Sequence, residues 1–285
     1  MTVSYPHDLN VDLHMHSTAS DGLLAPEVLV SRAAQNGVKI LSLTDHDTLA
    51  GQHAAMETAR SMGLRYIPGV EVSVTWGSET VHIVGLNVDV QNRVLNETLL
   101  AIQQGRESRA QKMASLLVSH GLPDLLEEAR GYARNPELIG RTHFARAMVA
   151  KGICPHMDAV FQSYLTPGKP GYLQHQWASL TDAVTSIRAA GGVAVLAHPA
   201  RYRLSAIGHW ALIDEFKTLG GSAIEVVTGS HTAQEARRFQ RVALEHGLQA
   251  SRGSDFHGDG ESRFDVGAVP ALPDATLPVW HAWSH

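Results

Sequence analysis

Cysteine is almost missing from this chain of 285 residues, which contains only Cys154. No disulfide can form within the chain, as is typical of proteins kept in a reducing compartment. No stretch approaches the roughly 20 apolar residues that a membrane-spanning helix needs. The first residues, MTVSYPHDLN, lack the basic region and apolar run of a secretory signal. We therefore expect a cytoplasmic protein without a membrane partner.

An excess of positive charge is also absent, since 23 lysines and arginines face 28 acidic residues, for a net charge of −5 with neutral histidines. This balance excludes the broad basic surface of a protein that binds duplex nucleic acid. A small anionic substrate stays compatible, because bound metal ions and local charge can outweigh the net charge. No G-x-x-x-x-G-K-[ST] loop occurs, so the sequence gives no sign of an NTPase.

Apolar β-rich runs alternate with helical segments along most of the chain. Strands are expected at 10–17, 39–47, 65–74, 80–90, 193–199, 222–229 and 248–257. Helices are expected at 25–37, 48–63, 179–192 and 232–247. Alternation of strands and helices favours an α/β fold in which parallel strands form a barrel.

Residues 92–175 interrupt this alternation with a charged helical stretch that ends in the Pro/Gly-rich segment YLTPGKPGYLQHQW. We interpret residues 8–91 and 176–285 as the barrel, and 92–175 as a helical cap inserted over its mouth. We expect Tyr172 and Trp177 to pack in a core or hinge. Charged helical faces are usually solvated, and most of four arginines are expected to be so: Arg106, Arg109, Arg130 and Arg134.

Histidine is abundant, with 17 residues, and two of them stand in H-x-H spacing as His14 and His16. Alternate residues of a strand face the same way, so the two imidazoles can hold one divalent metal ion. The other expected strands carry similar groups at or near their ends, namely His46, Glu71, His82, His198, Asp255 and His257. The carboxyl ends of barrel strands meet at one face. With Asp21, six histidines and three carboxylates would converge there, which predicts a site for several cations.

The motifs DLHMHS, LTDHD, GVEVS, HIVG, AHP and SDFH follow one another in this order, and together they resemble the polymerase-and-histidinol-phosphatase (PHP) family. The segments NPELIGRTHFARAMV and YLTPGKPGYLQHQWASLTDAV resemble its 3′,5′-nucleoside bisphosphate phosphatase branch, whose relatives also trim short RNA from the 5′ end. The resemblance implies a distorted seven-stranded (β/α) barrel with a trinuclear metal centre.

The resemblance also implies a set of ligands for two or three divalent cations per chain. One cation would be held by His14, His16, Glu71 and Asp255, and a second by the bridging Glu71 with His82 and His198. The third would be held by Asp21, His46 and His257. Some family members have histidine where Asp21 stands, so the third site is expected to be weaker or to vary in metal. Nitrogen and oxygen ligands without a thiolate suit Mn²⁺, Fe or Zn²⁺, and we expect manganese.

The expected activity is metal-dependent hydrolysis of the 3′-phosphate of 3′,5′-nucleoside bisphosphates, such as adenosine 3′,5′-bisphosphate, to nucleoside 5′-monophosphate. Arginine donates two parallel bonds to phosphate. Arg141 and Arg201 are therefore the first candidates for phosphate contacts, followed by Lys169 and His143. His231 is a candidate donor of the proton to the leaving 3′-oxygen; water bound to a metal ion is the alternative.

Three other hypotheses remain. The same centre could serve a 5′→3′ exoribonuclease that acts on short RNA. Hydrolysis of C–N bonds, as in amidohydrolases, would need a lysine at a strand end, but Lys39 precedes its expected strand. The metal ions could also only stabilise the fold, although structural sites are usually closed sets of four ligands. The sequence makes no prediction of oligomeric state.

Overall fold

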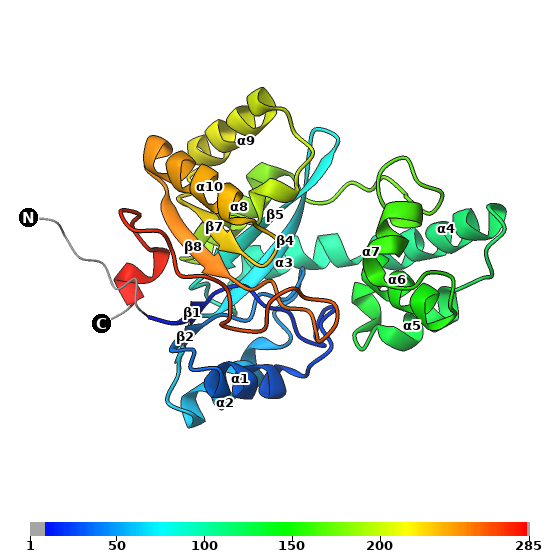
Figure 1. Cartoon of the computed structure of the whole chain (residues 1–285), viewed down its shortest axis with the longest axis horizontal. Coiled ribbons are helices and arrows are strands. Elements are labelled where there is room, and N and C mark those ends of the chain that lie inside the picture. Colours follow the sequence, from blue (N-terminus) through cyan, green and yellow to red (C-terminus); the bar gives the residue numbers. More distant parts are fainter. Residues whose placement is uncertain (1–8, 284–285) are drawn as a thin grey trace, which may run out of the picture.

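The computed structural model describes residues 9–283, which form a body of strands and helices with a smaller helical lobe beside it (Figure 1). The body contains two sheets. The first has three short parallel strands, β1 (Val11–Asp12), β2 (Ile40–Leu41) and β3 (Arg65–Tyr66). The second has five strands in spatial order, β4 (Gly69–Trp76), β5 (Glu79–Leu86), β6 (Val193–Leu196), β7 (Ala223–Thr228) and β8 (Gln249–Gly253).

Strand direction in the second sheet is mixed, which corrects the expectation of parallel strands. β4 and β5 form an antiparallel hairpin, and β5 also pairs antiparallel with β6. Only β6, β7 and β8 run parallel. The hairpin closes through the two-residue turn Gly77–Ser78, where Gly77 has a φ of 58°. A two-residue turn of this kind favours glycine because the backbone must enter the left-handed region.

The strand expected at 65–74 is two strands, β3 in the first sheet and β4 in the second. They are separated at Pro68, which has no N–H to continue a ladder. The expected α/β class is thus confirmed, but a closed seven-stranded barrel is not, because residues 9–283 contain eight strands. The two sheets meet through isolated bridges, His46 with Glu71 and Met15 with Phe256.

Helices surround the sheets and bury one apolar face each. They are α1 (Pro26–Gln35), α2 (Gln52–Ser61), α3 (Arg93–Gln103), α8 (Leu180–Ala189), α9 (Ala206–Thr218) and α10 (Ala233–His246). Short turns of 3₁₀ helix lie at η3 (Pro199–Arg201) and η4 (Val279–Trp283). The main core consists of valine, leucine and isoleucine from the second sheet and from the helices that cover it. No helix within residues 9–283 is long and apolar enough to cross a bilayer.

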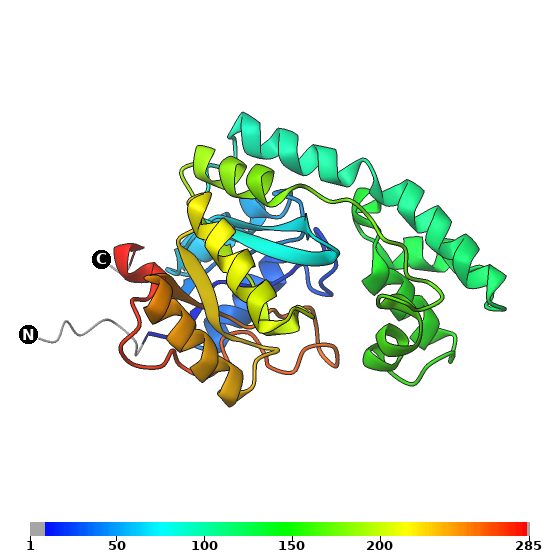
Figure 2. The ribbon, with the colours of Figure 1, turned by 90° about the horizontal axis from the view of Figure 1, so that it is seen from above.

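The lobe is helical, as expected for the inserted segment. It contains α4 (Arg106–Ser119), α5 (Leu126–Tyr132), α6 (Arg141–Ala150), α7 (Met157–Val160), the 3₁₀ turn η1 (Pro136–Leu138) and the π-helical turn η2 (Phe161–Leu165). Its own apolar core extends from Ala110 to Leu165 and includes the fully buried Phe144. Figure 2 shows α3 and α4 running in succession from body to lobe.

The first helix of the predicted insertion, α3, belongs to the body. Leu95, Leu99 and Ile102 of α3 lie in the main core, and α3 packs against α8. The separate core of the lobe therefore starts in α4, although the alternation of expected strands and helices already ends at residue 92. The start of the predicted barrel, residue 8, lies outside the described residues.

Candidate metal centre and its two clefts

His14 and His16 face the same site, just beyond β1. Their Nε2 atoms are 3.1 Å apart, and both side chains are fully buried. Backbone hydrogen bonds hold this segment between the sheets, since His16 N–H donates to the carbonyl of Phe256 and Asp255 N–H donates to the carbonyl of His14. Valine or isoleucine would pack here without the need for a polar partner, so the two imidazoles indicate a ligand site.

Glu71 lies at the centre of the cluster. It is the third residue of β4 and not the last residue of a strand, which corrects the expected position. Its Oε1 atom is 2.9 Å from both His82 Nδ1 and His198 Nε2. Its Oε2 atom is 2.9 Å from His46 Nδ1 and 3.4 Å from His16 Nε2. One carboxylate is thus shared by imidazoles from four separate segments.

The remaining predicted ligands complete the cluster from the opposite side. Asp255 Oδ1 is 3.2 Å from His16 Nε2, and Asp21 Oδ1 is 3.5 Å from His257 Nε2. The structure thus brings all nine predicted ligands together, in four overlapping groups whose donor atoms lie within 4.8 Å of one another. These groups are His16, Asp21, His46 and His257; His14, Glu71 and His198; His14, His16 and Asp255; and His46, Glu71 and His82.

The donor atoms fit divalent cations. Four buried atoms of the cluster make no well-aligned hydrogen bond among the described residues: the Nδ1 atoms of His16, His46 and His198, and Glu71 Oε2, although His46 Nδ1 and Glu71 Oε2 are close enough for an ion pair. Buried polar atoms are nearly always satisfied, so such a concentration requires an explanation. Imidazole nitrogens and carboxylate oxygens around shared positions suit transition-metal ions, which would use these lone pairs.

The protonation states of the cluster also fit a cation site. Burial disfavours the Glu71 carboxylate, but His82, His46 and His14 outweigh it and hold the pKa of Glu71 well below its usual range. Burial, together with His257 and His46, lowers the pKa of His16 to about 3. For His46, the carboxylates of Glu71 and Asp21 overcome burial and raise the pKa to about 9. A bound cation would therefore meet ionised carboxylates and displace a proton from His46.

A buried carboxylate that the sequence did not single out, Glu225, supports two ligands from β7. Its Oε1 atom is 2.7 Å from His14 Nδ1, and its Oε2 atom accepts a hydrogen bond of 2.6 Å from the His198 backbone N–H. Glu225 therefore orients His14 so that Nε2 faces the cluster. The sequence contained an indication of this role, because a glutamate within the apolar run AIEVV needs a partner when it is buried.

Three other buried aspartates shape the ligand loops without contacting an imidazole. Asp45 accepts hydrogen bonds from Ser17 and Ser20, and Asp12 accepts them from the backbone of Ser254 and Gly267. Asp47 accepts hydrogen bonds from Ser73 and forms an ion pair with an arginine of the lobe.

Left-handed backbone is concentrated at the same loops. Asp47, His198 and Asp255 have φ values of 53°, 25° and 53°. Non-glycine residues in this region are strained, and such strain is common at functional sites because the surrounding structure must enforce it. The surrounding structure thus enforces an unfavourable backbone conformation in the turns that follow β2, β6 and β8, and these turns carry the predicted ligands His46, His198 and Asp255.

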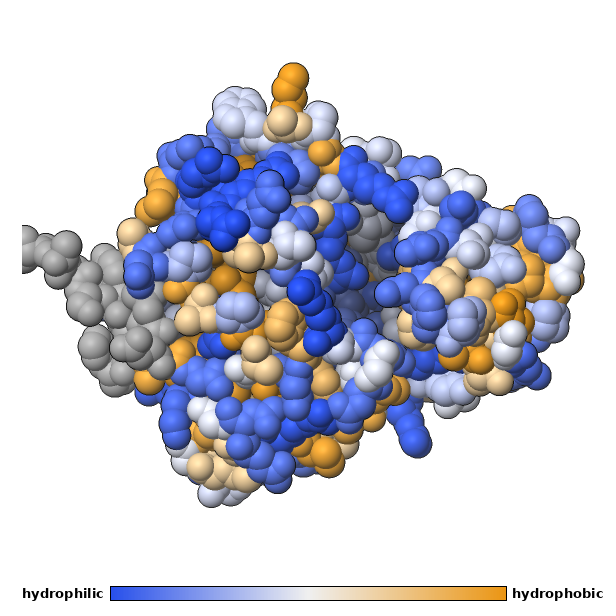
Figure 3. Space-filling view, in the orientation of Figure 1, coloured by the Kyte–Doolittle hydropathy of each residue, from blue (hydrophilic) through white to orange (hydrophobic). Residues whose placement is uncertain are grey.

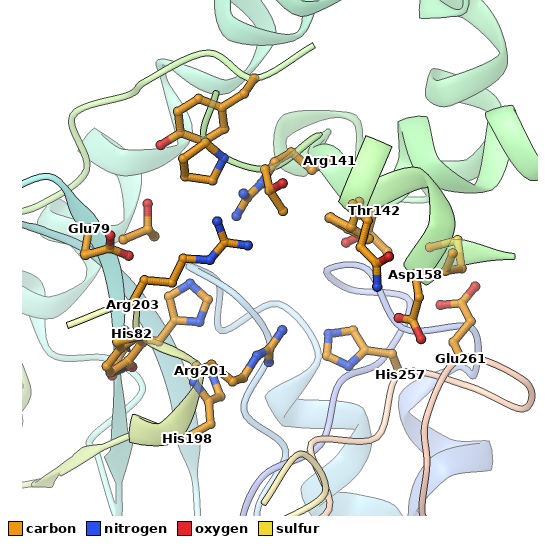
Figure 4. Close-up of a pocket in the computed structure, with 18 of the residues that line it drawn as sticks. Glu79, His82, Arg141, Thr142, Asp158, His198, Arg201, Arg203, His257 and Glu261 are labelled. Carbon is orange, nitrogen blue, oxygen red and sulfur yellow. Dashed lines mark hydrogen bonds between the residues drawn. The ribbon is translucent and has the colours of Figure 1, made fainter. Parts of the chain in front are cut away.

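A large cleft of about 430 Å³ opens between body and lobe beside the cluster. Figure 3 shows this hollow bordered by hydrophilic residues. Its wall includes the ligands His82, His198 and His257, and in Figure 4 the arginines Arg141, Arg201 and Arg203 point into it from different sides. Asp158 and Glu261 lie on the side of His257, and Glu79 lies on the side of His82, so the wall of the cleft carries both charge signs.

A small cleft of about 70 Å³ lies on the other side of Arg141 and Thr142, which line both clefts. It also reaches the cluster, at Asp21, His46 and His82. The remaining walls come from the lobe and the linker to α8, and include Arg106, Arg109, His143 and Trp177.

The predicted substrate contacts are only partly gathered at the clefts. Arg141 lines both, and Arg201 lines the large one, where its Nη1 donates to Asp255 Oδ2 at 2.8 Å. His143 lines the small one, but it is buried and its Nδ1 accepts the backbone N–H of Gly140. Lys169 is exposed and is not part of the wall of either cleft. Arg203, which sequence reasoning missed, lines the large cleft.

The candidate proton donor, His231, lies outside both cleft walls. It is buried against the ring of Phe239, and burial lowers its pKa. Its Nδ1 is 3.0 Å from the carbonyl of Val226, so Nδ1 carries the proton, and Nε2 accepts the N–H of Ala200 at 3.4 Å. With both nitrogens bonded to backbone, His231 supports the β6–η3 turn, and the geometry does not favour a proton-donating role.

The expectation that the lobe arginines are solvated is wrong for two of them. Arg106 and Arg109 are 7% and 6% exposed. Arg134 is exposed and Arg130 is half-exposed, as expected. The helical periodicity of α4 did not reveal this, because only its first turn, with Arg106 and Arg109, lines a polar cleft, whereas the rest of its inner face packs in the apolar core of the lobe.

Comparisons with known proteins support the geometry. A PHP-domain profile matches residues 12–124. The chain is 47% identical over 271 residues to the 3′,5′-nucleoside bisphosphate phosphatase of Chromobacterium violaceum, covering 95% of each protein. It is 40% identical over 274 residues to the 5′-3′ exoribonuclease Rnm of Escherichia coli, covering 95% of this chain and 93% of the relative.

Two solved structures share the fold over nearly the whole length. An amidohydrolase of Chromobacterium violaceum, with bound sulfate and no metal, superposes with a TM-score of 0.93 at 46% identity, covering 96% of this chain and 95% of the other. A protein of Bifidobacterium adolescentis assigned as a metal-dependent phosphoesterase superposes with a TM-score of 0.82 at 26% identity, covering 98% and 96%.

Proposed function

This chain belongs to the PHP family of metal-dependent phosphoesterases, and we propose that it removes the 3′-phosphate from 3′,5′-nucleoside bisphosphates. The observation that carries the proposal is the position of the nine-ligand cluster between two clefts lined by arginine. A substrate with two phosphates needs one group of cations at the reacting phosphate and a second, separate positive site. The relative from Chromobacterium violaceum acts on substrates of this kind, as its name states.

The nine clustered residues would hold two or three cations, with manganese as our first choice. By the family resemblance, one cation would bind His14, His16, Glu71 and Asp255; a second Glu71, His82 and His198; and a third Asp21, His46 and His257. The groups in the structure divide these residues differently, since Glu71 is grouped once with His46 and His82 and once with His14 and His198. When bound, such cations neutralise phosphoryl charge and lower the pKa of water enough to give a nucleophile near neutral pH. Glu225 would keep His14 in the tautomer with the proton on Nδ1, which leaves Nε2 free as a ligand.

Arg201 would bind the reacting phosphate from the cleft side. One of its terminal nitrogens is fixed by Asp255, which is itself a predicted ligand, and the guanidinium adjoins His198 and His82 in the cleft wall. The planar group retains further donors for phosphoryl oxygens. Because Asp255 fixes the guanidinium before substrate arrives, little side-chain entropy is lost on binding.

The large cleft is suited to the nucleoside. Its volume of about 430 Å³ lies within the range of small-molecule sites, roughly 300–1,000 Å³. Tyr172, Phe161 and Met157 supply an apolar and aromatic wall from the lobe, opposite the strand residues Glu79 and Thr80. Tyr172 thus lines the site, where the sequence suggested core or hinge packing.

A 5′→3′ exoribonuclease is the second candidate, favoured by the 40% identity to Rnm over nearly the whole chain. Both activities would break a bond at the phosphate on the 3′-oxygen, so one cluster could serve both. Hydrolysis of C–N bonds is not favoured, although one structural neighbour is an amidohydrolase. No lysine among the described residues lines either cleft or belongs to the ligand groups.

A substrate panel tests the proposal. Protein reconstituted with Mn²⁺, Fe²⁺ or Zn²⁺ is incubated with adenosine 3′,5′-bisphosphate, adenosine 3′-monophosphate, adenosine 5′-monophosphate and a 5′-phosphorylated RNA oligomer, and the products are separated by chromatography. We expect phosphate and adenosine 5′-monophosphate from the bisphosphate. Turnover of the oligomer alone would favour the exoribonuclease, and no turnover of any substrate with any metal would refute both.

A further inference from the structure

The polar contacts between lobe and body are confined to one part of the cluster. Within residues 9–283, each side-chain hydrogen bond or ion pair that joins residues 106–172 to the body ends in one of three loops, 17–24, 45–48 or 257–262. These loops carry Asp21, His46 and His257, whose donor atoms form one group with His16. The ligands expected for the other two cations are bonded only within the body.

Building on the metal centre of the proposed function, we propose that Thr142 of α6 is a positioning residue for the third cation, the one assigned to Asp21, His46 and His257. Thr142 acts through Asp21 and is not itself a ligand. Binding of this cation and docking of the lobe on the body therefore strengthen one another, whereas the other two cations bind independently of the lobe.

The two oxygens of the Asp21 carboxylate have separate partners. Oδ1 faces the cluster, 3.5 Å from His257 Nε2, and Oδ2 accepts a hydrogen bond of 2.8 Å from the hydroxyl of Thr142. The Ser20 hydroxyl is 3.5 Å from Oδ1, but it donates to Asp45 at 2.6 Å. Thr142 thus makes the one short hydrogen bond to this carboxylate among residues 9–283. A partner that fixes one carboxylate oxygen orients the other toward a cation.

Arg146, one turn further along α6, holds the backbone of the same loop. Its Nη2 donates to the carbonyl of Asp21 at 2.5 Å, and its Nε and Nη2 donate to Glu261 at 2.8 and 2.7 Å. The two loops are also joined to each other, since the Leu23 N–H donates to the His257 carbonyl at 2.7 Å. One helix of the lobe therefore keeps two of the three ligand loops in a single arrangement.

The third loop is bonded at the base of the lobe. Asp47, the residue after His46, forms an ion pair with Arg106 at the start of α4, and its carbonyl accepts a hydrogen bond of 2.6 Å from Gln103 Nε2. Asp47 has a φ of 53°, a conformation that a non-glycine residue keeps only where its surroundings enforce it. Movement of the lobe would disturb this turn and with it the position of His46.

The position of α6 also determines the shape of both clefts, because Arg141 and Thr142 line each of them. Coupling between two equilibria is reciprocal, so the factor by which docking favours the cation is the factor by which the cation favours docking. Occupancy of the third site would therefore favour the arrangement in which the lobe completes the cleft walls, and this cation would influence substrate binding through the lobe.

The first test replaces Thr142 with valine, which has nearly the same shape and helix propensity but no hydroxyl. Calorimetric titration of the metal-free protein with Mn²⁺, with elemental analysis of the loaded protein, should show a loss of about tenfold for one cation and less than about twofold for the others. A larger loss is not expected, because the Asp21 side chain is 12% exposed and can accept water instead.

Two further variants control this measurement. Thr142→Ser keeps the hydroxyl and should bind every cation within about threefold of the wild type. Thr185→Val makes the same chemical change at an exposed position of α8 and should leave all affinities unchanged.

Hydrogen exchange distinguishes coupling from a merely structural contact. Exchange is followed in peptides covering 17–24 and 135–150, the two sides of the contact, and in β4 and β5 as a reference within the body. In the wild type, Mn²⁺ should slow exchange in both contact peptides. In Asp21→Ala, Mn²⁺ should still slow exchange in β4 and β5 but no longer in 135–150.

Three results would overturn the inference: equal Mn²⁺ affinities in the wild type and Thr142→Val, an equal loss at every cation, or protection of 135–150 by Mn²⁺ that persists in Asp21→Ala. Both measurements are made without substrate, so they decide the inference whether or not a nucleotide is hydrolysed. A wild type that bound only two Mn²⁺ would refute the inference and leave a phosphatase with two cations intact. Coupling without turnover of any substrate would refute the proposed function alone.

Discussion

Replacing Glu225 with glutamine tests whether a residue without direct access to the cations controls their binding. In the native protein both carboxylate oxygens accept, one from His14 Nδ1–H at 2.7 Å and one from the His198 N–H at 2.6 Å. Glutamine has one acceptor oxygen and one donor nitrogen. In either orientation of the amide, a donor must face a donor, so one of the two ligands loses its support.

The size of the effect follows from the burial of this group, which is 1% exposed. Loss of one hydrogen bond to a charged acceptor costs about 1.5–3 kcal/mol, or about 10- to 100-fold in an equilibrium constant. Changes in residues that support metal ligands fall in the same range for metal affinity. The glutamine is uncharged, so the neutral imidazole of His14 is also a weaker base toward a cation. We therefore expect Glu225→Gln to weaken Mn²⁺ binding by about 10- to 100-fold.

Calorimetric titration of the metal-free protein with Mn²⁺ measures this loss. The matched control is Asp12→Asn, which alters an equally buried carboxylate that contacts no imidazole and accepts from the backbone N–H groups of His14, Ser254 and Gly267. The control should lower the melting temperature while changing Mn²⁺ affinity by less than about threefold. If Glu225→Gln bound Mn²⁺ as tightly as the wild type, or if the control lost as much affinity, the reasoning that Glu225 acts through His14 and His198 would be wrong.

Four further outcomes are expected. Saturating Mn²⁺ at about 100 times its Kd should add about 2.7 kcal/mol per site, visible as a rise of several degrees in melting temperature; an unchanged melting curve would contradict the fit of the cluster. Asp21→Ala should lower the bound metal by one ion per chain, measured by elemental analysis, and Asp21→His should restore it. Arg141→Ala should reduce kcat/KM more for adenosine 3′,5′-bisphosphate than for the 3′-monophosphate, and equal losses would count against contact with the 5′-phosphate. Arg146 holds Glu261 at 2.7–2.8 Å across lobe and body and also donates to the carbonyl of Asp21, so Arg146→Ala should raise KM and weaken binding of the third cation without affecting the other two.

The sequence predicted the positions of the strands better than their pairing. Alternating apolar residues marked both 65–74 and 80–90 as strands; the first run contains β3 and most of β4, and the second contains most of β5. Their antiparallel direction depends on the short turn at Gly77, and the division of the first run depends on Pro68. A β-rich pattern is the same in parallel and antiparallel strands, so direction was assigned from the general alternation and was partly wrong.

All nine candidate ligands could be selected from the sequence because each lies in a short motif that resembles the PHP family, and the structure brings them together. The residues that were missed depend on contacts between distant segments. Glu225 supports a predicted ligand because β7 passes His14, and Arg109 is buried because the first turn of α4 lines a cleft. Arginine on a charged helix is usually solvated, so no local pattern distinguishes Arg109 from Arg134. Only the tertiary structure shows which of them is buried without a partner.

The contacts that join the two sheets of the body are made by residues of the metal-ligand cluster. The two sheets join at two places, and predicted ligands make the joining contacts at both. At one seam His16 and Asp255 donate their backbone N–H groups across the gap, and at the other His46 pairs with Glu71. Isolated bridges supply few backbone hydrogen bonds compared with a continuous ladder. Cations bound by ligands from both sheets would stabilise the contact between them, which lacks a continuous ladder of backbone hydrogen bonds. The centre that is proposed to carry out hydrolysis would therefore also stabilise the fold of the body.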